Sequence, residues 1–298
     1  MKDQTSSLPQ GKPRLRDYLE LVKFSHTVFA LPFALASMIV AAGRPFGSGL
    51  PPLRVVGWIL VAMIGARTAA MGFNRIVDRD IDKANPRTAK REIPAGVISI
   101  RQAAILVALS AALFVFAASQ LNKLAFVLAI PTLGVLFFYS FCKRFTSFAH
   151  VVLGVCLGIA PAGAWVAVRG KLELAPVLLA LAVMFWVAGF DVIYATMDDE
   201  FDKRAQLHSL VQKWGIKGAL LAARVFHMFF IALLVAFGSV ARMSTWYFAG
   251  VMLIALFLIY EHSLVDASDL RRVNAAFFTV NGVISVFFLV VVALAVFL

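Results

Sequence analysis

Two pairs of aspartates are the residues in this chain whose type and spacing most clearly point to chemistry. Asp78 and Asp82 lie four residues apart, and the same spacing recurs 120 residues later at Asp198 and Asp202. Eight of the 16 Asp and Glu residues fall within residues 78–82 and 191–202, so half of the negative charge is concentrated in two short stretches. The repeated spacing indicates an internal duplication of a helical unit.

The chemistry of such a pair follows from helix geometry. Residues four apart share one face of a helix, so the two carboxylates of a pair repel each other and need a compensating cation. Mg²⁺ would suit two pairs that face each other across a bundle, because it takes oxygen ligands and is commonly shared with substrate phosphates. A solvated helix cap explains one pair more simply than it explains two copies. The other source of positive charge is the basic residues nearby in sequence, namely Arg75, Arg79, Lys83, Lys203 and Arg204.

The elements that position these aspartates are membrane-spanning helices. The chain is 61% hydrophobic and only 15% charged, which is outside the range of soluble domains. A helix needs about 20 residues to cross the hydrocarbon of a bilayer. We therefore predict an all-α membrane protein, a bundle of nine transmembrane helices, at residues 24–43, 55–74, 102–119, 122–141, 149–168, 174–194, 216–238, 245–262 and 274–298.

The distribution of basic residues predicts the orientation. Of the 28 Lys and Arg, 20 fall on the side of the N-terminus, six on the other side, and two, Arg67 and Arg224, inside spans. By the positive-inside rule the N-terminus is cytoplasmic and the C-terminus lies outside. The net charge of +12 then needs no nucleic acid as a partner, because a basic face toward an anionic bilayer and an anionic substrate accounts for it. We expect a basic cytoplasmic segment over residues 1–22 and a single transmembrane domain over residues 23–298.

Polar side chains inside apolar spans are functional candidates, because they are costly in hydrocarbon. Arg67 precedes Asn74 by about two helical turns. Asp191 lies seven residues before Asp198, on nearly the same helix face and about two turns deeper. His26 is a third such residue, and its role is left open together with that of His208.

Four stretches of the sequence carry a resemblance to a known family. The segments RTAAMGFNRIVDRDID, RTAKREIPAG and DVIYATMDDEFD resemble the aspartate-rich signatures of the UbiA superfamily of intramembrane aromatic prenyltransferases. The segment YSFCKR at 139–144 resembles the Tyr-x-x-x-Lys element of that family. One departure is Arg75, which stands where many members have Asp and leaves open whether metal binding is altered. The segments KFSHTVFALPFALASM and LHSLVQKWG resemble the subgroup of 4-hydroxybenzoate polyprenyltransferase-like members.

The resemblance implies a fold, a reaction and a site. It implies a helical bundle with a central cavity open to the cytoplasmic side, in the inner membrane of a bacterium. The implied reaction is Mg²⁺-dependent transfer of a polyprenyl group from an allylic polyprenyl diphosphate to a hydroxylated aromatic acid, as in ubiquinone biosynthesis. Allylic ionisation would be assisted by groups that neutralise the leaving diphosphate. The implied metal ligands are Asn74, Asp78, Asp82, Asp198 and Asp202.

The remaining implied residues bind substrate. Lys143 and Arg144 would hold diphosphate oxygens, the Tyr139 hydroxyl would orient them, and Arg67 would contact diphosphate or pair with an aspartate. Asp191, two turns deeper than Asp198, would hydrogen-bond a phenol or receive the proton that the ring loses. Tyr194 is assigned to substrate binding, and Asp78, Asp191 and Asp198 are assigned to catalysis.

Two alternatives remain open on the sequence. The acceptor could instead be 1,4-dihydroxy-6-naphthoate, in menaquinone biosynthesis, because both acceptors are hydroxylated aromatic acids. In a different class, an internal repeat with intramembrane charges is also typical of a secondary transporter or a carrier of an anionic lipid. A transporter site is expected near the bilayer midplane, whereas both acidic stretches here lie at the cytoplasmic boundary beside basic loops. The enzyme is therefore the favoured interpretation.

Overall fold

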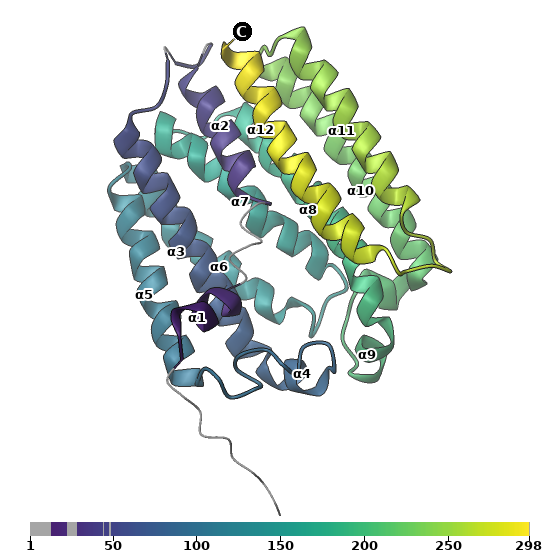
Figure 1. Cartoon of the computed structure of the whole chain (residues 1–298). Helices are drawn as coiled ribbons and strands as arrows, with labels where there is room; N and C mark the ends of the chain where they lie inside the picture. Colours follow the sequence, from purple (N-terminus) through teal and green to yellow (C-terminus); the bar gives the residue numbers. More distant parts are fainter. Residues whose placement is uncertain (1–12, 23–28, 44, 48, 298) are drawn as a thin grey trace, which may run out of the picture.

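The computed structural model describes residues 13–22, 29–43, 45–47 and 49–297, and these residues fold into a bundle of helices (Figure 1). The predicted all-α membrane architecture is confirmed. Three short helices, α1, α4 and α9, lie together at one end of the bundle (Figure 1). The elements in chain order are α1 (Leu15–Leu21), α2 (Leu31–Ala42), α3 (Leu53–Val77), α4 (Arg79–Ala84), α5 (Ile100–Ser119), α6 (Lys123–Cys142), α7 (Ala149–Arg169), α8 (Leu174–Ala195), the 3₁₀ turn η2 (Thr196–Asp198), α9 (Asp199–Arg204), α10 (Leu210–Val240), α11 (Thr245–Ser263), the π-helical turn η3 (Ala275–Val280) and α12 (Asn281–Phe297).

Eight helices in the described part of the chain are long and apolar enough to cross a membrane. They match eight of the nine predicted spans closely at most ends. The largest difference is at α10, which begins at Leu210 instead of residue 216. Gly215 interrupts this helix with a positive φ of 68°, a backbone conformation that glycine adopts without strain. The predicted start therefore coincides with the kink, and one further turn precedes it.

The first predicted span, at 24–43, differs from the other eight. In the structure α2 has 12 residues, a length of about 18 Å that is shorter than the roughly 30 Å hydrocarbon of a bilayer. Pro32 lies in the first turn of α2, where its missing N–H costs least, and this position favours a helix start. Residues 23–28, which include His26, lie outside the described residues. Within the described ranges, the predicted nine spans are eight full-length helices and this short one.

Helices α7 and α8 approach each other closely through two glycines of α7. A Cβ atom on Gly154 would lie 2.2 Å from the carbonyl oxygen of Met184, and one on Gly158 would lie 2.5 Å from that of Ala180. The two glycines are four residues apart, so they form one small strip on the helix face that meets α8. Only glycine permits this separation, and the strip therefore fixes how α7 and α8 are aligned.

Buried polar groups connect α8 with α10, α11 and α12. The Trp186 indole N–H donates to the side-chain oxygen of Asn281 at 2.7 Å, and the Asn281 amide donates to Glu261 at 2.7 Å. A ring nitrogen of His227 lies 3.2 Å from the Trp186 carbonyl oxygen. Because polar groups inside a membrane must be satisfied by the protein, these contacts fix the Trp186 ring. That ring packs edge-on against Phe190, with centroids 5.0 Å apart.

The short helices mark one end of the bundle, and the C-terminus lies at the opposite end (Figure 1). Both acidic stretches lie at the end with the short helices, because α4 follows α3 directly and α9 follows α8 through η2. The predicted assignment of this end to the cytoplasm and the predicted central cavity stay predictions.

Candidate active site

Asp78 terminates α3 and is buried among basic groups from the end of α6. Its Oδ2 accepts hydrogen bonds from Lys143 Nζ at 2.6 Å and from the Asn74 side-chain amide at 3.1 Å. Arg144 donates to Asp78 Oδ1 at 3.3 Å and to the Val77 carbonyl oxygen at 2.8 Å. Only 3% of the residue is exposed, so Asp78 is not a solvated cap. The structure thus brings together four of the predicted site residues.

Asp82 lies on α4 in a second basic environment. Arg91 donates to its Oδ1 at 2.7 Å, and Arg75 Nη1 lies 3.9 Å from its Oδ2. Oδ2 is buried and has no hydrogen-bond partner among the described residues. Arg75 itself is buried and donates through Nε to the Leu21 carbonyl oxygen at 3.3 Å, which ties α1 to α3. Arg75, which departs from the family pattern, therefore holds α1 against α3 and also lies beside the carboxylate of Asp82.

Asp198 is held by the loop that follows α4. Arg87 donates to both of its carboxylate oxygens, one of them at 2.9 Å, and the Asn85 amide donates to Oδ1 at 3.1 Å. Arg87 also donates to the Tyr194 hydroxyl at 2.8 Å and lies over the Tyr194 ring. Burial lowers the pKa of Arg87, but the bonds to Asp198 outweigh it and raise that pKa above the usual arginine value. The two acidic stretches are therefore joined through one loop.

The loop after α9 closes the site against α6. The His208 backbone N–H donates to the Lys143 carbonyl oxygen at 2.8 Å, while the His208 side chain is exposed. Asp202, half-buried on α9, interacts electrostatically with Asp198 and Lys143. His208 thus contributes through its backbone, which fixes the residue beside the diphosphate-binding candidate.

A second group of residues lies in the first turn of α7 and the last turn of α8. Asp191 on α8 is 2.7 Å from Nδ1 of His150, the second residue of α7. Tyr139 on α6 interacts electrostatically with both Asp191 and Asp78. Arg67 is half-buried on α3, and its contact with an aspartate or with diphosphate stays a prediction.

The cations that neutralise the aspartates come mostly from distant segments. Of the basic residues near in sequence, Arg79 pairs with exposed Asp80 at 3.5 Å and Arg204 with exposed Glu200 at 3.4 Å. Only Arg75 lies beside a buried aspartate of the pairs. The prediction that basic residues near in sequence neutralise the aspartates is therefore wrong for Asp78 and Asp198. Tertiary packing supplies Lys143 and Arg87 as their partners instead.

Sequence reasoning missed four residues of this site. Arg87 and Arg91 lie in the stretch RTAKREIPAG, which was itself a signal, but nothing in their spacing showed which aspartate each would meet. Asn85 lies just before that stretch. His150 belongs to no recognisable pattern, and only the packing of α7 on α8 reveals its partner. All four became visible through contacts between segments.

The arrangement of the predicted metal ligands only partly matches a metal site. Among the described residues, no three His, Cys, Asp or Glu side chains converge as a metal site. Three of the four aspartates are instead each paired with a cation, Asp78 with Lys143, Asp82 with Arg91 and Asp198 with Arg87. The arrangement can bind a polyanion through its cations and a hard cation through its carboxylates.

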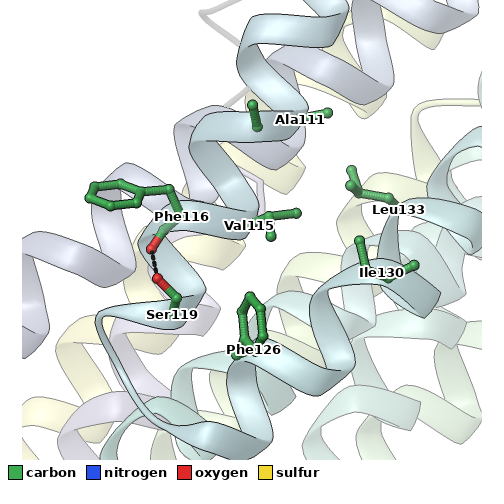
Figure 2. A pocket seen from close by; sticks show the side chains of 8 residues that line it. Ala111, Val115, Phe116, Ser119, Phe126, Ile130 and Leu133 are labelled. Carbon is green, nitrogen blue, oxygen red and sulfur yellow. Dashed lines mark hydrogen bonds between the residues drawn. The ribbon is translucent and has the colours of Figure 1, made fainter.

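An apolar groove of about 560 Å³ between α5 and α6 is not part of this site (Figure 2). The Ser119 hydroxyl in it already donates to the Phe116 carbonyl oxygen at 2.7 Å. No charged side chain lines the groove, so it offers no group for a diphosphate. Its lining residues are Ala111, Ala112, Val115, Phe116, Ser119, Phe126, Ile130 and Leu133.

Comparison with known proteins identifies relatives of the whole bundle. Residues 30–296 match the UbiA prenyltransferase family. A 4-hydroxybenzoate octaprenyltransferase from Idiomarina loihiensis is 31% identical over 84% of this chain and 86% of its own length. A second protein of that name, from Aromatoleum aromaticum, is 29% identical over 82% of this chain and 83% of its own.

Solved structures agree with these sequence matches. The apo structure of a UbiA homolog from Aeropyrum pernix K1 superposes with a TM-score of 0.81 and 33% identity, covering 91% of this chain and 98% of that one. A UbiA homolog from Archaeoglobus fulgidus, bound to GPP and Mg²⁺, shares the fold with a TM-score of 0.68 and 22% identity, covering 93% of this chain and 99% of that one.

Proposed function

The chain belongs to the UbiA prenyltransferase family, and from this premise we propose that it transfers a polyprenyl group from an allylic polyprenyl diphosphate to a hydroxylated aromatic acid of the 4-hydroxybenzoate type, in quinone biosynthesis. The observation that carries the proposal is the site at the end of α3, α6 and α8, where Lys143, Arg144 and Arg87 alternate with Asp78 and Asp198. The relatives named 4-hydroxybenzoate octaprenyltransferase support this class of acceptor.

The ion pairs of the site provide a way to bind a metal diphosphate without leaving charges unpaired. Lys143 lies 2.6 Å from Asp78, and Arg87 donates to both carboxylate oxygens of Asp198. A diphosphate can replace the carboxylates as partner of these cations, and the carboxylates would then be available to hold a metal ion. The exchange keeps every buried charge compensated, which is the condition for ion pairs in a low-dielectric site. Lys143 and Arg87 then hold the phosphate oxygens as the C–O bond breaks.

The donor set fits Mg²⁺ chemically. It consists of oxygen ligands, and Asp82 presents a buried Oδ2 with no hydrogen-bond partner among the described residues. When bound, Mg²⁺ would neutralise the negative charge that develops on the leaving diphosphate. The archaeal homolog bound to GPP and Mg²⁺ gives independent support for this ion. The residues that would hold it are Asn74, Asp78, Asp82, Asp198 and Asp202.

Aromatic side chains next to the diphosphate site would protect the allylic cation from water. The centroids of the Tyr194 and Phe277 rings are 4.2 Å apart. Phe277 packs edge-on against Phe190, with centroids 5.2 Å apart. The Tyr194 hydroxyl is fixed by Arg87, so the ring is positioned by the same guanidinium that meets Asp198. These rings exclude water and present π faces to a cation. The Tyr139 hydroxyl is assigned to orientation of the diphosphate, and Arg67 to contact with diphosphate or pairing with an aspartate.

The proposal includes the place and orientation of the enzyme. We assign it to the inner membrane of a bacterium, with the site and the N-terminus facing the cytoplasm. The excess of basic residues on that side supports the orientation. A soluble aromatic acid then enters from the cytoplasm, while the polyprenyl chain stays in the bilayer.

The other two interpretations are less well supported. A transporter or carrier does not agree with membership of a prenyltransferase family. The alternative acceptor, 1,4-dihydroxy-6-naphthoate, would undergo the same chemistry, and the names of the relatives favour the hydroxybenzoate.

A transfer assay with a matched pair of variants tests the proposal. Purified full-length protein is given a radiolabelled polyprenyl diphosphate and a panel of aromatic acids, with and without Mg²⁺. We expect Asp78→Asn to lose on the order of 10²-fold or more of the transfer rate, because it removes a charged group that organises the diphosphate site. Asp80→Asn is the control, since Asp80 lies two residues away with its side chain 81% exposed. Equal transfer rates for the two variants, or a transfer rate that is the same with and without Mg²⁺, would overturn the proposed site.

A further inference from the structure

Buried His150 and partly buried Asp191 form a pair that the diphosphate site does not use. His150 Nδ1 lies 2.7 Å from Asp191 Oδ2, and only 7% of the His150 side chain is exposed. The other ring nitrogen, Nε2, is buried and has no hydrogen-bond partner among the described residues. A buried polar atom without a partner is rare in folded proteins and calls for an explanation.

The hydrogen bond to Asp191 determines which ring nitrogen is free to accept. A carboxylate accepts hydrogen bonds, so Nδ1 of the neutral imidazole carries the hydrogen and donates it to Asp191. Nε2 then carries a lone pair and can accept a hydrogen bond or a proton. The carboxylate also stabilises the imidazolium that forms if Nε2 is protonated. The pair therefore has the arrangement of an oriented base.

The fold holds this base at a fixed place relative to the diphosphate site. Gly154 lies one turn after His150 on α7, and its close approach to Met184 of α8 sets the separation of the two helices. Asp191 lies about one turn before the end of α8, and Asp198 follows in the turn η2.

The charged and titratable groups around the pair come from three other elements. Tyr139 on α6 interacts electrostatically with Asp191, and Asp202 on α9 interacts with His150. Lys143 at the end of α6 and Arg87 interact with the same Asp202. On α7 itself, Cys156 interacts with Tyr139. The base is thus close to the diphosphate-binding groups but bonded to none of them.

We propose that His150 Nε2 binds the hydroxyl group of the aromatic acceptor and takes its proton as the ring attacks, with Asp191 as the carboxylate that orients the imidazole. This inference rests on the proposed function. It reassigns Asp191 from direct contact with the acceptor to a positioning residue. The base is then supplied by a histidine that no sequence pattern indicates.

The step balances as follows in atoms and electrons. The O–H bond breaks, its proton goes to Nε2, and its electron pair becomes the C=O π bond. A ring π pair forms the new C–C bond from the carbon next to C–OH to the allylic carbon, whose C–O electron pair leaves with the diphosphate. The ring C–H bond of the resulting dienone then breaks. Its electron pair restores the aromatic π system, its proton goes to an oxygen of the departing diphosphate, and the C=O π pair takes back the proton from the imidazolium. His150 is regenerated, and one proton is released for each diphosphate.

The variant His150→Asn tests the role of Nε2. Asparagine keeps an N–H donor for Asp191 at the position of Nδ1 but lacks the basic nitrogen. With a polyprenyl diphosphate and either 4-hydroxybenzoate or 1,4-dihydroxy-6-naphthoate, whichever the wild type uses, we expect kcat/KM for the acceptor to fall by about 10²-fold. The KM for the donor and the slow diphosphate release without acceptor should stay unchanged. Asp80→Asn, at a side chain that is 81% exposed, is the control.

An acceptor with a more acidic hydroxyl group distinguishes proton transfer to His150 from a purely structural role of this residue. For a wild type that uses 4-hydroxybenzoate, the hydroxyl of 3-fluoro-4-hydroxybenzoate ionises more readily and needs the base less. The ratio of wild-type to His150→Asn activity should therefore be smaller with the fluorinated acceptor. An equal ratio for both acceptors would overturn proton transfer to His150, and an unchanged acceptor kcat/KM would overturn the whole inference.

A second variant tests the same inference if His150→Asn does not fold. Asp191→Asn places an amide beside Nδ1, which can donate to Nδ1 and favours the tautomer with hydrogen on Nε2. The same loss of acceptor kcat/KM is expected, with unchanged donor KM, and full acceptor turnover would overturn the inference. A wild type that transfers no prenyl group to any aromatic acid would instead overturn the proposed function, so the two failures are distinguishable.

Discussion

Substitution of Gly154 by Ala perturbs the contact between α7 and α8 at its narrowest point. The added Cβ would lie 2.2 Å from the Met184 carbonyl oxygen, which is about 1.2 Å short of the 3.4 Å at which ordinary contact begins. The obstacle is backbone, so it cannot rotate away as a side chain would. The helices must separate locally.

The size of the effect follows from two terms. Overpacking of a tight contact costs about 1–3 kcal/mol. Replacing Gly by Ala within a helix contributes roughly 0.5–1 kcal/mol in the opposite direction. A matched substitution in open space on the same helix removes the second term from the comparison. Gly163→Ala is that control, because a Cβ there would meet nothing within 4 Å.

The separation should also reach the pair of His150 and Asp191, one turn from Gly154. If the whole shift of about 1.2 Å is transmitted, the 2.7 Å contact lengthens to about 3.9 Å, beyond hydrogen-bond range. A misplacement of about 1 Å at a catalytic group can cost 10²-fold in rate. We therefore expect Gly154→Ala to lower both stability and acceptor kcat/KM relative to Gly163→Ala.

The assay measures melting temperature in detergent and steady-state kinetics for both variants. A melting temperature lower by at least about 2 °C than that of Gly163→Ala is expected for a cost of 1 kcal/mol or more. The acceptor kcat/KM should fall while the donor KM changes little, because Lys143 and Arg87 are on other elements. Indistinguishable melting temperatures and kinetics for Gly154→Ala and Gly163→Ala would refute the argument that backbone contact aligns the two helices.

Two further predictions concern the diphosphate site. Lys143→Ala should raise the donor KM or slow ionisation with little change in acceptor KM, and the reverse pattern in steady-state kinetics would move Lys143 to the other substrate. A non-hydrolysable prenyl thiodiphosphate and Mg²⁺ together should raise the melting temperature by more than the sum of the two separate shifts. Each ligand at a hundredfold excess over its Kd contributes about 2.7 kcal/mol. Asp82→Asn should remove that synergy, because an amide oxygen is a weaker Mg²⁺ ligand, whereas a full synergistic shift would place the metal elsewhere.

The local elements of this protein could be predicted from sequence, because the information for them is local. Hydropathy over about 20 residues located the long helices, most of them to within a few residues. The two acidic stretches were expected where long helices end, and Asp78 does end α3 while Asp198 closes the turn after α8. The expectation that each pair shares one helix was wrong, because the chain starts a new short helix after the first aspartate of each pair and puts Asp82 on α4 and Asp202 on α9. Lys143 was recognised by the residues around it. The correct inferences needed only the residues near each position along the chain.

The partners of those residues were decided by tertiary structure. Asp198 meets Arg87, 111 residues away, and Asp78 meets Lys143, 65 residues away. Neither pairing follows from charge alone, since nearer cations such as Arg79 and Arg204 have exposed partners of their own.

The pair of His150 and Asp191 shows the physical reason. A single histidine at a helix end carries no periodic signal, and the chance that it meets a given carboxylate depends on how two helices are aligned. That alignment is set by steric contact of Gly154 and Gly158 with the backbone of α8. The sequence by itself determined which helices form and which charges end them, because those depend on neighbours along the chain. Tertiary structure alone determined which side chains touch, because those contacts depend on helix separation and rotation that only packing fixes.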